Sequence, residues 1–237
     1  MKLLKNQRIF IISGAGMSKP SGIDTFTGED SLWNDFDLDV VSNFDTWIEN
    51  YESVHDFYNL RRINLADKKP NKAHDIIHEL QTRFGTGKII NITTNTDNLF
   101  NVAGINETIE VHGNICKMKN IHSQKLFSVG YEAFDYTLYK HKVFKPNVVF
   151  YKEKVEAYSI LDRLLNGESS IVNHGDIFIF IGISFNSTFI DRYLPKNKLV
   201  HTINVNPDKK TNSEYEFDEN YNYCATKALE DIFCAVI

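Results

Sequence analysis

The sequence predicts an α/β fold, a Rossmann-like open parallel sheet with helices on both faces, together with a small second domain built from insertions. Short apolar runs are continuous rather than alternating and rich in Ile, Val and Phe, which is typical of strands buried on both faces. Segments with helical spacing separate these runs, so the strands are joined by right-handed crossovers. Ser, Thr, Asn and Gly follow each run, at the strand ends where open α/β sheets place their ligand crevice.

The apolar runs predict four strands, and the segments between them predict three helices. The strands are expected at residues 8–13 (RIFIIS), 88–93 (KIINIT), 177–182 (IFIFIG) and 199–204 (LVHTIN). The helices are expected at residues 44–64, 71–85 and 154–167, where apolar residues recur every three or four positions. Asn71 is a suitable N-cap for the second helix, and Gly85 and Gly167 are suitable C-caps for the last two.

The polar segments after the strands favour a binding site. They read SGAGMS, TTNTDNLF, GISFNST and NVNPDKK. Any one of them could be ordinary turn chemistry, because these residue types dominate turns. Four of them facing one crevice favour a nucleotide-like ligand with many hydroxyls and phosphates.

Composition excludes several classes of protein. The chain has 237 residues and a net charge of −5, so it needs no basic face and suggests no nucleic-acid partner. No apolar stretch approaches the roughly 20 residues that span a bilayer, which predicts no membrane partner. Its three cysteines are too few and too scattered for a disulfide framework. We therefore expect a cytoplasmic protein. The oligomeric state stays open.

One region fits the alternating pattern poorly. Residues 114–146 are polar, aromatic and without a clear period. We interpret 1–237 as a single catalytic unit with a large domain over approximately 1–29, 71–113 and 147–237. A small domain is expected from the insertions at approximately 30–70 and 114–146.

The glycine-rich loop after the first strand is the strongest local signal. Gly14 and Gly16 allow a diphosphate to approach the backbone, and the amides at the start of a helix there would face its charge. As a dinucleotide fingerprint the loop is weak, because Lys19 occupies the position of the third glycine.

The continuation of that loop belongs to a longer ordered series of motifs. The series is GAGMSKPSGIDTFTG, KPNKAH, TTNTDNLF, VHGN, KPNVVFYKE, GIS and INVNP. It resembles the sirtuin family of NAD-dependent protein deacylases from Gly14 to about Leu229. The resemblance implies a Rossmann-like domain with a smaller inserted domain, NAD between them, and an acylated protein or peptide as the partner substrate.

The resemblance also implies roles for individual residues. It places Asn95 and Asp97 in the nicotinamide and ribose pocket, although both could instead cap a helix that begins near Asp97. His112 matches the catalytic general base, a role that needs a pKa near neutrality, whereas His74 is expected to pack within its helix. The catalytic set is therefore His112, Asn95 and Asp97. The full NAD-binding set adds Gly14, Ala15, Gly16, Ser18, Asp24, Thr25, Phe26, Thr94, Gly182, Ser184, Asn204, Cys224 and Ala225.

Some of these residues have specific implied tasks. Phe26 matches the aromatic residue that shields the reactive ribose carbon from water. Gly182, Ser184 and Asn204 match positions on the adenosine half, and Cys224 and Ala225 lie where a loop usually closes over adenine. Cys224 could equally be a small core residue.

The sequence departs from the family in three places. GIPDFRG is here GIDTFTG, which removes an arginine that Thr27 cannot replace. The paired CxxC motifs of the family's structural zinc site are missing, so we expect no metal; the alternative is a non-standard site of Cys116, His122 and His141. In the acyl-peptide groove, Tyr151 and Lys152 replace Phe and Gly, while Val148 and Phe150 are expected to supply backbone pairing.

Three functions remain in competition. The retained Asn95, Asp97 and His112 favour an NAD-dependent protein-lysine deacylase, which transfers the acyl group to ADP-ribose and releases nicotinamide. The altered loop and groove favour an NAD hydrolase or ADP-ribosyltransferase on the same scaffold. A non-catalytic module that binds NAD or ADP-ribose is the third alternative, and the presence of His112 argues against it.

Overall fold

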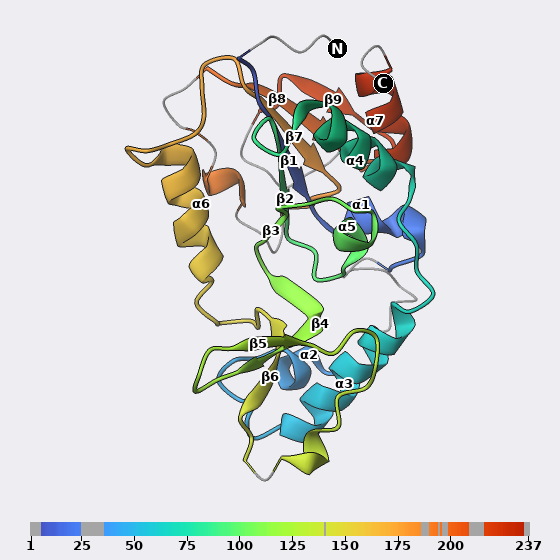
Figure 1. Ribbon diagram of the computed structural model, residues 1–237, viewed down its shortest axis with the longest axis vertical. Helices are drawn as coiled ribbons and strands as arrows, with labels where there is room; N and C mark the ends of the chain where they lie inside the picture. The colour runs from blue at the N-terminus through green and yellow to red at the C-terminus, as the bar shows by residue number, and fades with distance from the viewer. Residues whose placement is uncertain are drawn as a thin grey trace.

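A six-stranded parallel sheet forms the centre of the larger part of the molecule (Figure 1). The computed structural model describes residues 6–24, 36–139, 141–185, 190–193, 195, 199–208 and 216–234. The strand order is β3-β2-β1-β7-β8-β9. The strands are β1 (Ile9–Ser13), β2 (Ile89–Thr93), β3 (Ile109–Glu110), β7 (Ile177–Ile181), β8 (His201–Val205) and β9 (Glu219–Tyr221). All four predicted strands are present, and β8 lies slightly later in the chain than its apolar run.

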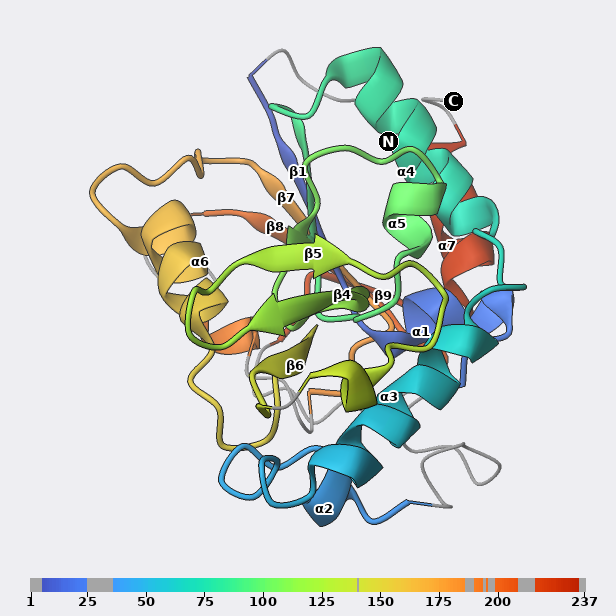
Figure 2. The ribbon, with the colours of Figure 1, turned by 60° about the horizontal axis from the view of Figure 1, so that its bottom comes forward.

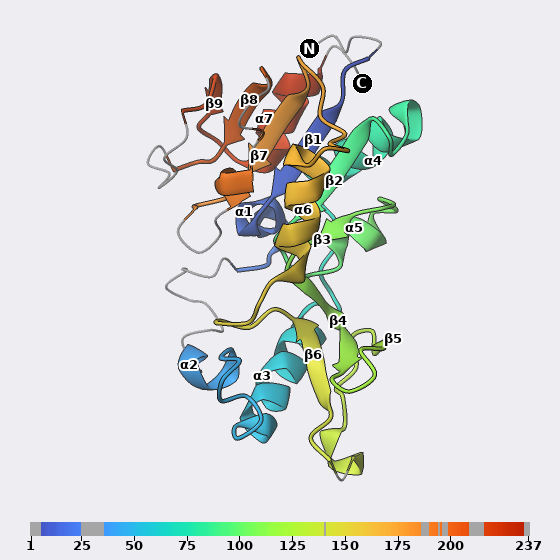
Figure 3. The same cartoon turned by 90° about the vertical axis from the view of Figure 1, so that its left-hand side faces the viewer.

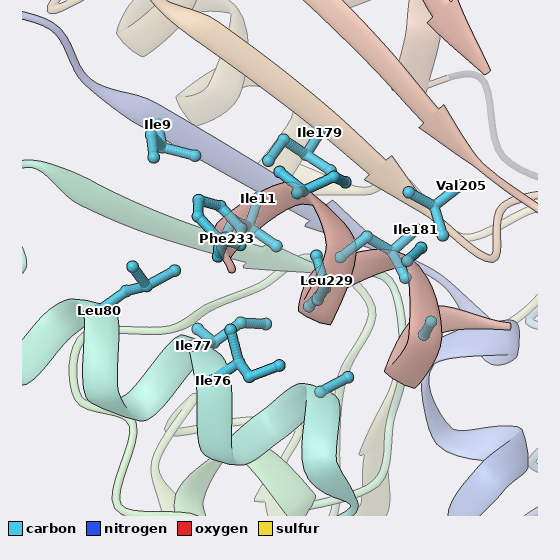
Figure 4. Close-up of a cluster of buried hydrophobic side chains, with 14 of the residues drawn as sticks. Ile9, Ile11, Ile76, Ile77, Leu80, Ile179, Ile181, Val205, Leu229 and Phe233 are labelled. Atoms are coloured by element: carbon cyan, nitrogen blue, oxygen red, sulfur yellow. The ribbon is translucent and has the colours of Figure 1, made fainter. Parts of the chain in front are cut away.

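Successive residues of the central strands face opposite layers, as the period of a strand requires. Ile9 and Ile11 of β1 join one core cluster, whereas Phe10 and Ile12 join another. The first cluster, shown in Figure 4, packs against α4 (Lys72–Phe84) and α7 (Ala225–Phe233). The second packs against α6 (Glu156–Asn166) and the short 3-10 helix η4 (Ile190–Tyr193). The prediction of helices on both faces is therefore correct.

Two of the predicted helices have the predicted ends. The Asn71 side chain accepts a hydrogen bond from the Ala73 amide, and His74 completes a capping box at the start of α4. Gly85 and Gly167 follow α4 and α6 at their C-caps. His74 is buried within its helix, as predicted.

The helix predicted at residues 44–64 is shorter in the structure than the apolar spacing indicates. Residues 44–64 yield α3 (Tyr51–Asn64) only, and residues 44–50 form turns. This first third is tied to a distant segment instead, because the Phe44 amide donates to the Tyr151 carbonyl at 3.0 Å. A spacing of three and four residues does not distinguish such consecutive turns from a helix.

A second group of elements forms a smaller lobe beside the main sheet (Figure 2, Figure 3). It contains an antiparallel sheet ordered β5-β4-β6, covered by α2 and α3 over a shared apolar core. Its further elements are β4 (Gly113–Asn120), β5 (Leu126–Ser128), β6 (Phe144–Val148), α2 (Leu38–Val41) and η3 (Tyr136–Leu138). The larger lobe also contains α1 (Ala15–Ser18), η1 (Lys19–Ser21) and α5 (Leu99–Val102). Strand β4 leaves the end of β3 and runs toward the smaller lobe (Figure 3).

The described residues contain neither a helix able to cross a membrane nor a cluster of three potential metal ligands. Cys116 is buried, whereas His122 and His141 are exposed. The described residues therefore do not assemble the alternative Cys116/His122/His141 site.

Candidate functional site

The candidate site lies at the point of the sheet where the strand order reverses, between β1 and β7. Strands β2 and β3 extend the sheet on one side of β1, and β7, β8 and β9 extend it on the other. Such a switch point creates a crevice at the carboxyl ends of its two central strands. Here those ends are Ser13–Gly14 after β1 and Gly182 after β7.

Gly16 and Gly182 make the two strand ends fit together. The Gly16 amide donates to the Gly182 carbonyl at 3.0 Å, and a Cβ on Gly16 would lie 2.6 Å from the Gly182 Cα. Gly182 itself has φ +62°, a conformation that favours glycine. The glycines are thus required for the close approach of two backbones at the floor of the crevice.

Several amides of the loop bond to neighbouring backbone carbonyls. Gly14 donates to the Ile181 carbonyl, Gly16 to Gly182, and Met17 to Gly14. These three amides, two of them in α1, are therefore used within the fold. The contact of this loop with a diphosphate stays a prediction.

Ser18, Asn95 and Asp97 form one hydrogen-bonded network beside this loop. The Asn95 Nδ2 donates to the Gly14 carbonyl and to Ser18 Oγ, both at 3.0 Å. The Ser18 hydroxyl in turn donates to Asp97 Oδ2 at 2.8 Å. Ser18 and Asn95 are buried, so each partner supplies a bond that water does not.

Asp97 also bonds to the first amide of α5 (Leu99–Val102), in line with the alternative that it caps this helix. Its Oδ1 accepts from the Leu99 amide at 3.0 Å, at the start of α5. Burial raises the pKa of the Asp97 carboxyl, while these hydrogen bonds and the nearby Arg61 guanidinium of α3 act in the opposite direction. The capping and the network contacts therefore coexist in one side chain.

His112 lies between β3 and β4, at the junction of the two lobes. Its Nδ1 lies 3.0 Å from the Thr94 carbonyl, and its own carbonyl accepts from the Val149 amide at 3.0 Å. Thr94 is fixed because its amide and hydroxyl both donate to the Ser13 carbonyl. Burial lowers the pKa of His112, so the ring is neutral at pH 7.

A tyrosine that the sequence did not point to contacts the other nitrogen of this ring. The Tyr158 hydroxyl lies 3.1 Å from His112 Nε2, and the two rings are edge to face with centroids 6.0 Å apart. Tyr158 also stacks on Tyr193 of η4. No sequence pattern links residues 46 positions apart, so only the fold brings Tyr158 to His112.

The other predicted nucleotide-binding residues lie along the ends of β7, β8 and α7. Asn204 is buried, and its Oδ1 has no hydrogen-bond partner among the described residues, while its Nδ2 donates to Asn220 Oδ1 at 3.1 Å. Ser184 is exposed after β7. Cys224 is exposed at the N-cap of α7 and Ala225 is buried behind it. Cys224 is therefore not the small core residue that the sequence also allowed.

The two residues predicted to line the peptide groove lie in the smaller lobe. Val148 and Phe150 are buried in the core of the smaller lobe. The Val148 carbonyl accepts from Lys145, and the Phe150 amide and carbonyl both bond to Glu153. These backbone groups are thus bonded within the smaller lobe, and pairing of the two residues with a peptide stays a prediction.

The GIDTFTG segment is described only up to Asp24, which is exposed. Thr25 and Phe26, predicted to line the site, lie outside the described residues, as does Thr27.

Comparison with known proteins identifies the family. The model of the Sir2 family matches residues 14–188. An NAD-dependent protein deacylase of Campylobacter jejuni (strain RM1221) is 33% identical over 233 residues, covering 97% of this chain and 93% of that protein. A protein of the same name from Helicobacter hepaticus is 30% identical, covering 95% and 89%.

Solved structures show the same fold. A mutant Sir2 homologue in complex with ADP-ribose superposes with a TM-score of 0.82 at 24% identity, covering 97% of this chain and 91% of that one. A Sir2 homologue in complex with NAD gives a TM-score of 0.80 at 25% identity, covering 97% and 89%. The chain belongs to the Sir2, or sirtuin, family.

Proposed function

We propose that this protein is an NAD-dependent protein-lysine deacylase. In that reaction NAD accepts the acyl group of a lysine side chain on its ADP-ribose part, one water is consumed, and nicotinamide and the free lysine are released. The observation that carries the proposal is the His112 ring, held at the lobe junction by the Thr94 carbonyl, which is close in the chain to the network of Ser18, Asn95 and Asp97. The names of the similar bacterial proteins support the same activity.

The residues of the crevice suit a dinucleotide. Gly16 and Gly182 let the ends of β1 and β7 meet backbone to backbone, and we propose that the dinucleotide lies over this contact. The buried Asn204 Oδ1, which has no hydrogen-bond partner in the described part of the chain, offers an acceptor for a ribose hydroxyl or an adenine amine. In this proposal the residues from Gly14 to Ser18 line the diphosphate side. Ser184, Asn204, Cys224 and Ala225 line the adenosine side.

His112 is proposed as the general base. Its Nδ1 carries the ring proton that faces the Thr94 carbonyl, which leaves Nε2 as the basic nitrogen. That nitrogen would take a proton from a ribose hydroxyl during acyl transfer. Thr94 orients the ring in the way a hydrogen-bonded partner orients a catalytic imidazole.

Asn95 and Asp97 are proposed to form the nicotinamide and ribose pocket. Asn95 has its amide nitrogen fixed by Gly14 and Ser18, so its carbonyl oxygen has a defined direction for recognising an amide. Asp97 is held from two sides by Ser18 and Leu99. Both side chains are therefore pre-organised before a ligand arrives.

The broader assignment follows from the same proposal. The small domain would comprise the insertions at approximately 30–70 and 114–146, and the large domain the rest, with NAD between them. We propose an acylated protein as partner and a cytoplasmic location, and we propose that Cys116 serves packing beside Arg62 rather than zinc ligation.

An assay of nicotinamide release tests the function. Purified protein would be incubated with NAD, with and without a panel of acyl-lysine peptides. His112→Ala should lower peptide-dependent release by about 10²- to 10⁴-fold. The matched control is His174→Ala. His174 is an exposed histidine just before β7, at the amino end of that strand, whereas the candidate site lies at its carboxyl end.

Each outcome selects one function. Release that requires a peptide and disappears with His112→Ala supports deacylation. Release without any peptide supports the hydrolase or ADP-ribosyltransferase alternative. NAD binding without release across the panel supports a binding module and contradicts both enzymatic functions.

A further inference from the structure

We propose that Tyr158 is a positioning residue that caps the basic nitrogen of His112 in the free enzyme and must leave it before His112 can act. The proposal rests on the deacylase function above, since it concerns the base of that reaction. It assigns a role to a residue on α6 that the family motifs do not include.

The direction of the hydrogen bond follows from the partners of the ring. A carbonyl oxygen only accepts, so the 3.0 Å contact with Thr94 places the proton on His112 Nδ1. In the neutral imidazole Nε2 then carries a lone pair and no proton. The Tyr158 hydroxyl, 3.1 Å away, must therefore be the donor.

The phenol is held in place by rigid elements. Tyr158 occupies the third position of α6, and its ring is stacked on Tyr193 with centroids 4.9 Å apart and planes 12° apart. The Asn166 side chain donates to the Tyr193 carbonyl at 3.1 Å and so ties η4 to the end of α6. The hydroxyl thus reaches His112 from a packed helix and not from a free loop.

A single lone pair cannot serve two donors. The proposed reaction requires Nε2 to accept a proton from a ribose hydroxyl, and Tyr158 occupies this position in the free protein. The ribose hydroxyl and the phenol are therefore exclusive partners. Because a donor at Nε2 stabilises the neutral ring, Tyr158 makes His112 less basic until substrate displaces it.

Charged groups on the strands and segments that neighbour His112 are engaged with other partners. They come from β3, β4, β6 and the segments after β2 and β6. The pairs are Glu110 with Lys117 at 3.0 Å, Lys145 with Glu153 at 2.8 Å, and Asp97 with Ser18 at 2.8 Å. Among the described residues, the groups within hydrogen-bond distance of the His112 ring nitrogens are the Thr94 carbonyl and the Tyr158 hydroxyl.

Two pH profiles test the proposal. In Tyr158→Phe the ring stack is retained and only the donor is lost. The acid limb of kcat/KM reports the free enzyme, so it should move to higher pH, whereas the limb of kcat reports the complex and should stay. At a pH on that limb, kcat/KM relative to its own plateau should fall about threefold to tenfold below the wild type, the effect of one lost hydrogen bond. Tyr193→Phe, which keeps the stack and the Tyr158 hydroxyl, should leave both limbs unchanged.

A second readout does not depend on activity. NMR titration of His112 in the free protein should show the Nδ1–H tautomer and a ring that protonates at higher pH in Tyr158→Phe than in the wild type. If His112 titrates identically in both proteins, or if kcat and kcat/KM shift together, the proposal is wrong. If the titration shifts but no deacylation occurs with any peptide, the cap stands and the proposed function fails.

Discussion

Gly16 and Gly182 lie in direct backbone contact at the ends of β1 and β7, where the Gly16 amide donates to the Gly182 carbonyl at 3.0 Å. This contact lies at the carboxyl ends of two central strands, so it joins the stability of the sheet to the shape of the proposed nucleotide site. A side chain at either position would force the two strand ends apart.

Gly16→Ala should therefore weaken both folding and NAD binding. Its Cβ would meet backbone atoms of Gly182, which cannot rotate away, and overpacking of this kind costs about 1–3 kcal/mol. Chemical denaturation and calorimetric NAD titration measure the two effects. Gly87→Ala is the control, because a Cβ there meets nothing within 4 Å. Equal behaviour of the two variants would contradict the packing argument.

Ser18→Ala should destabilise the protein by about 1–3 kcal/mol, because it leaves the half-buried Asp97 carboxylate and the buried Asn95 amide each short of a partner. NAD binding should weaken as well, since both side chains lose their fixed positions. Urea unfolding and NAD titration check this, with the exposed Ser159→Ala of α6 as a control. A variant as stable as the wild type would show that water replaces the hydroxyl.

The pH dependence of deacylation should follow His112. Only the neutral ring can accept a proton, so activity falls as the pH drops through the pKa of His112. Burial lowers that pKa below its usual 6.5, so the acid limb of kcat/KM should lie below pH 6.5. Steady-state rates between pH 5 and pH 8 measure it. Half-maximal activity above pH 7 would contradict His112 as the base.

Stability should depend on His74 over the same range for a different reason. Burial lowers the pKa of His74 from 6.5 to about 4, so between these values the unfolded chain binds more protons than the folded one. The free energy of unfolding should therefore decline as the pH falls from 6.5 toward 4, by up to about 1.4 kcal/mol per pH unit for this group. Urea unfolding at pH 7 and pH 5 measures the decline.

His74→Gln separates this effect from packing. Gln can keep the capping box with Asn71 but does not titrate, so the decline should become shallower. His55, whose pKa burial lowers to about 4, still titrates and should leave part of the slope. An unchanged slope in His74→Gln would place the acid sensitivity elsewhere.

The sequence predicted the parts of the fold that depend on local pattern. Continuous apolar runs identified β1, β2, β7 and β8, and a cap at each end identified α4. The two-residue β3 and the three-residue β9 lack enough length for a pattern, so they were missed. Residues 44–50 show the opposite error, because turns held by Tyr151 have the same spacing as a helix.

The sequence predicted the site residues that belong to short motifs, but not the contacts that depend on packing. Ser18, Asn95, Asp97 and His112 belong to short motifs, and Ser18, Asn95 and Asp97 meet in one network. Tyr158 could not be found, because its contact with His112 depends on how α6 packs against the sheet. Nor could the sequence show that Lys145 and Glu153 bond the Val148 carbonyl and the Phe150 amide.

The most direct test of the proposed function is the stoichiometry of products from NAD and one acyl-lysine peptide, measured by mass spectrometry. The account predicts equal amounts of nicotinamide, deacylated peptide and ADP-ribose carrying the acyl group, all lost together in His112→Ala. Nicotinamide and unmodified ADP-ribose, formed while the peptide keeps its acyl group, would contradict it.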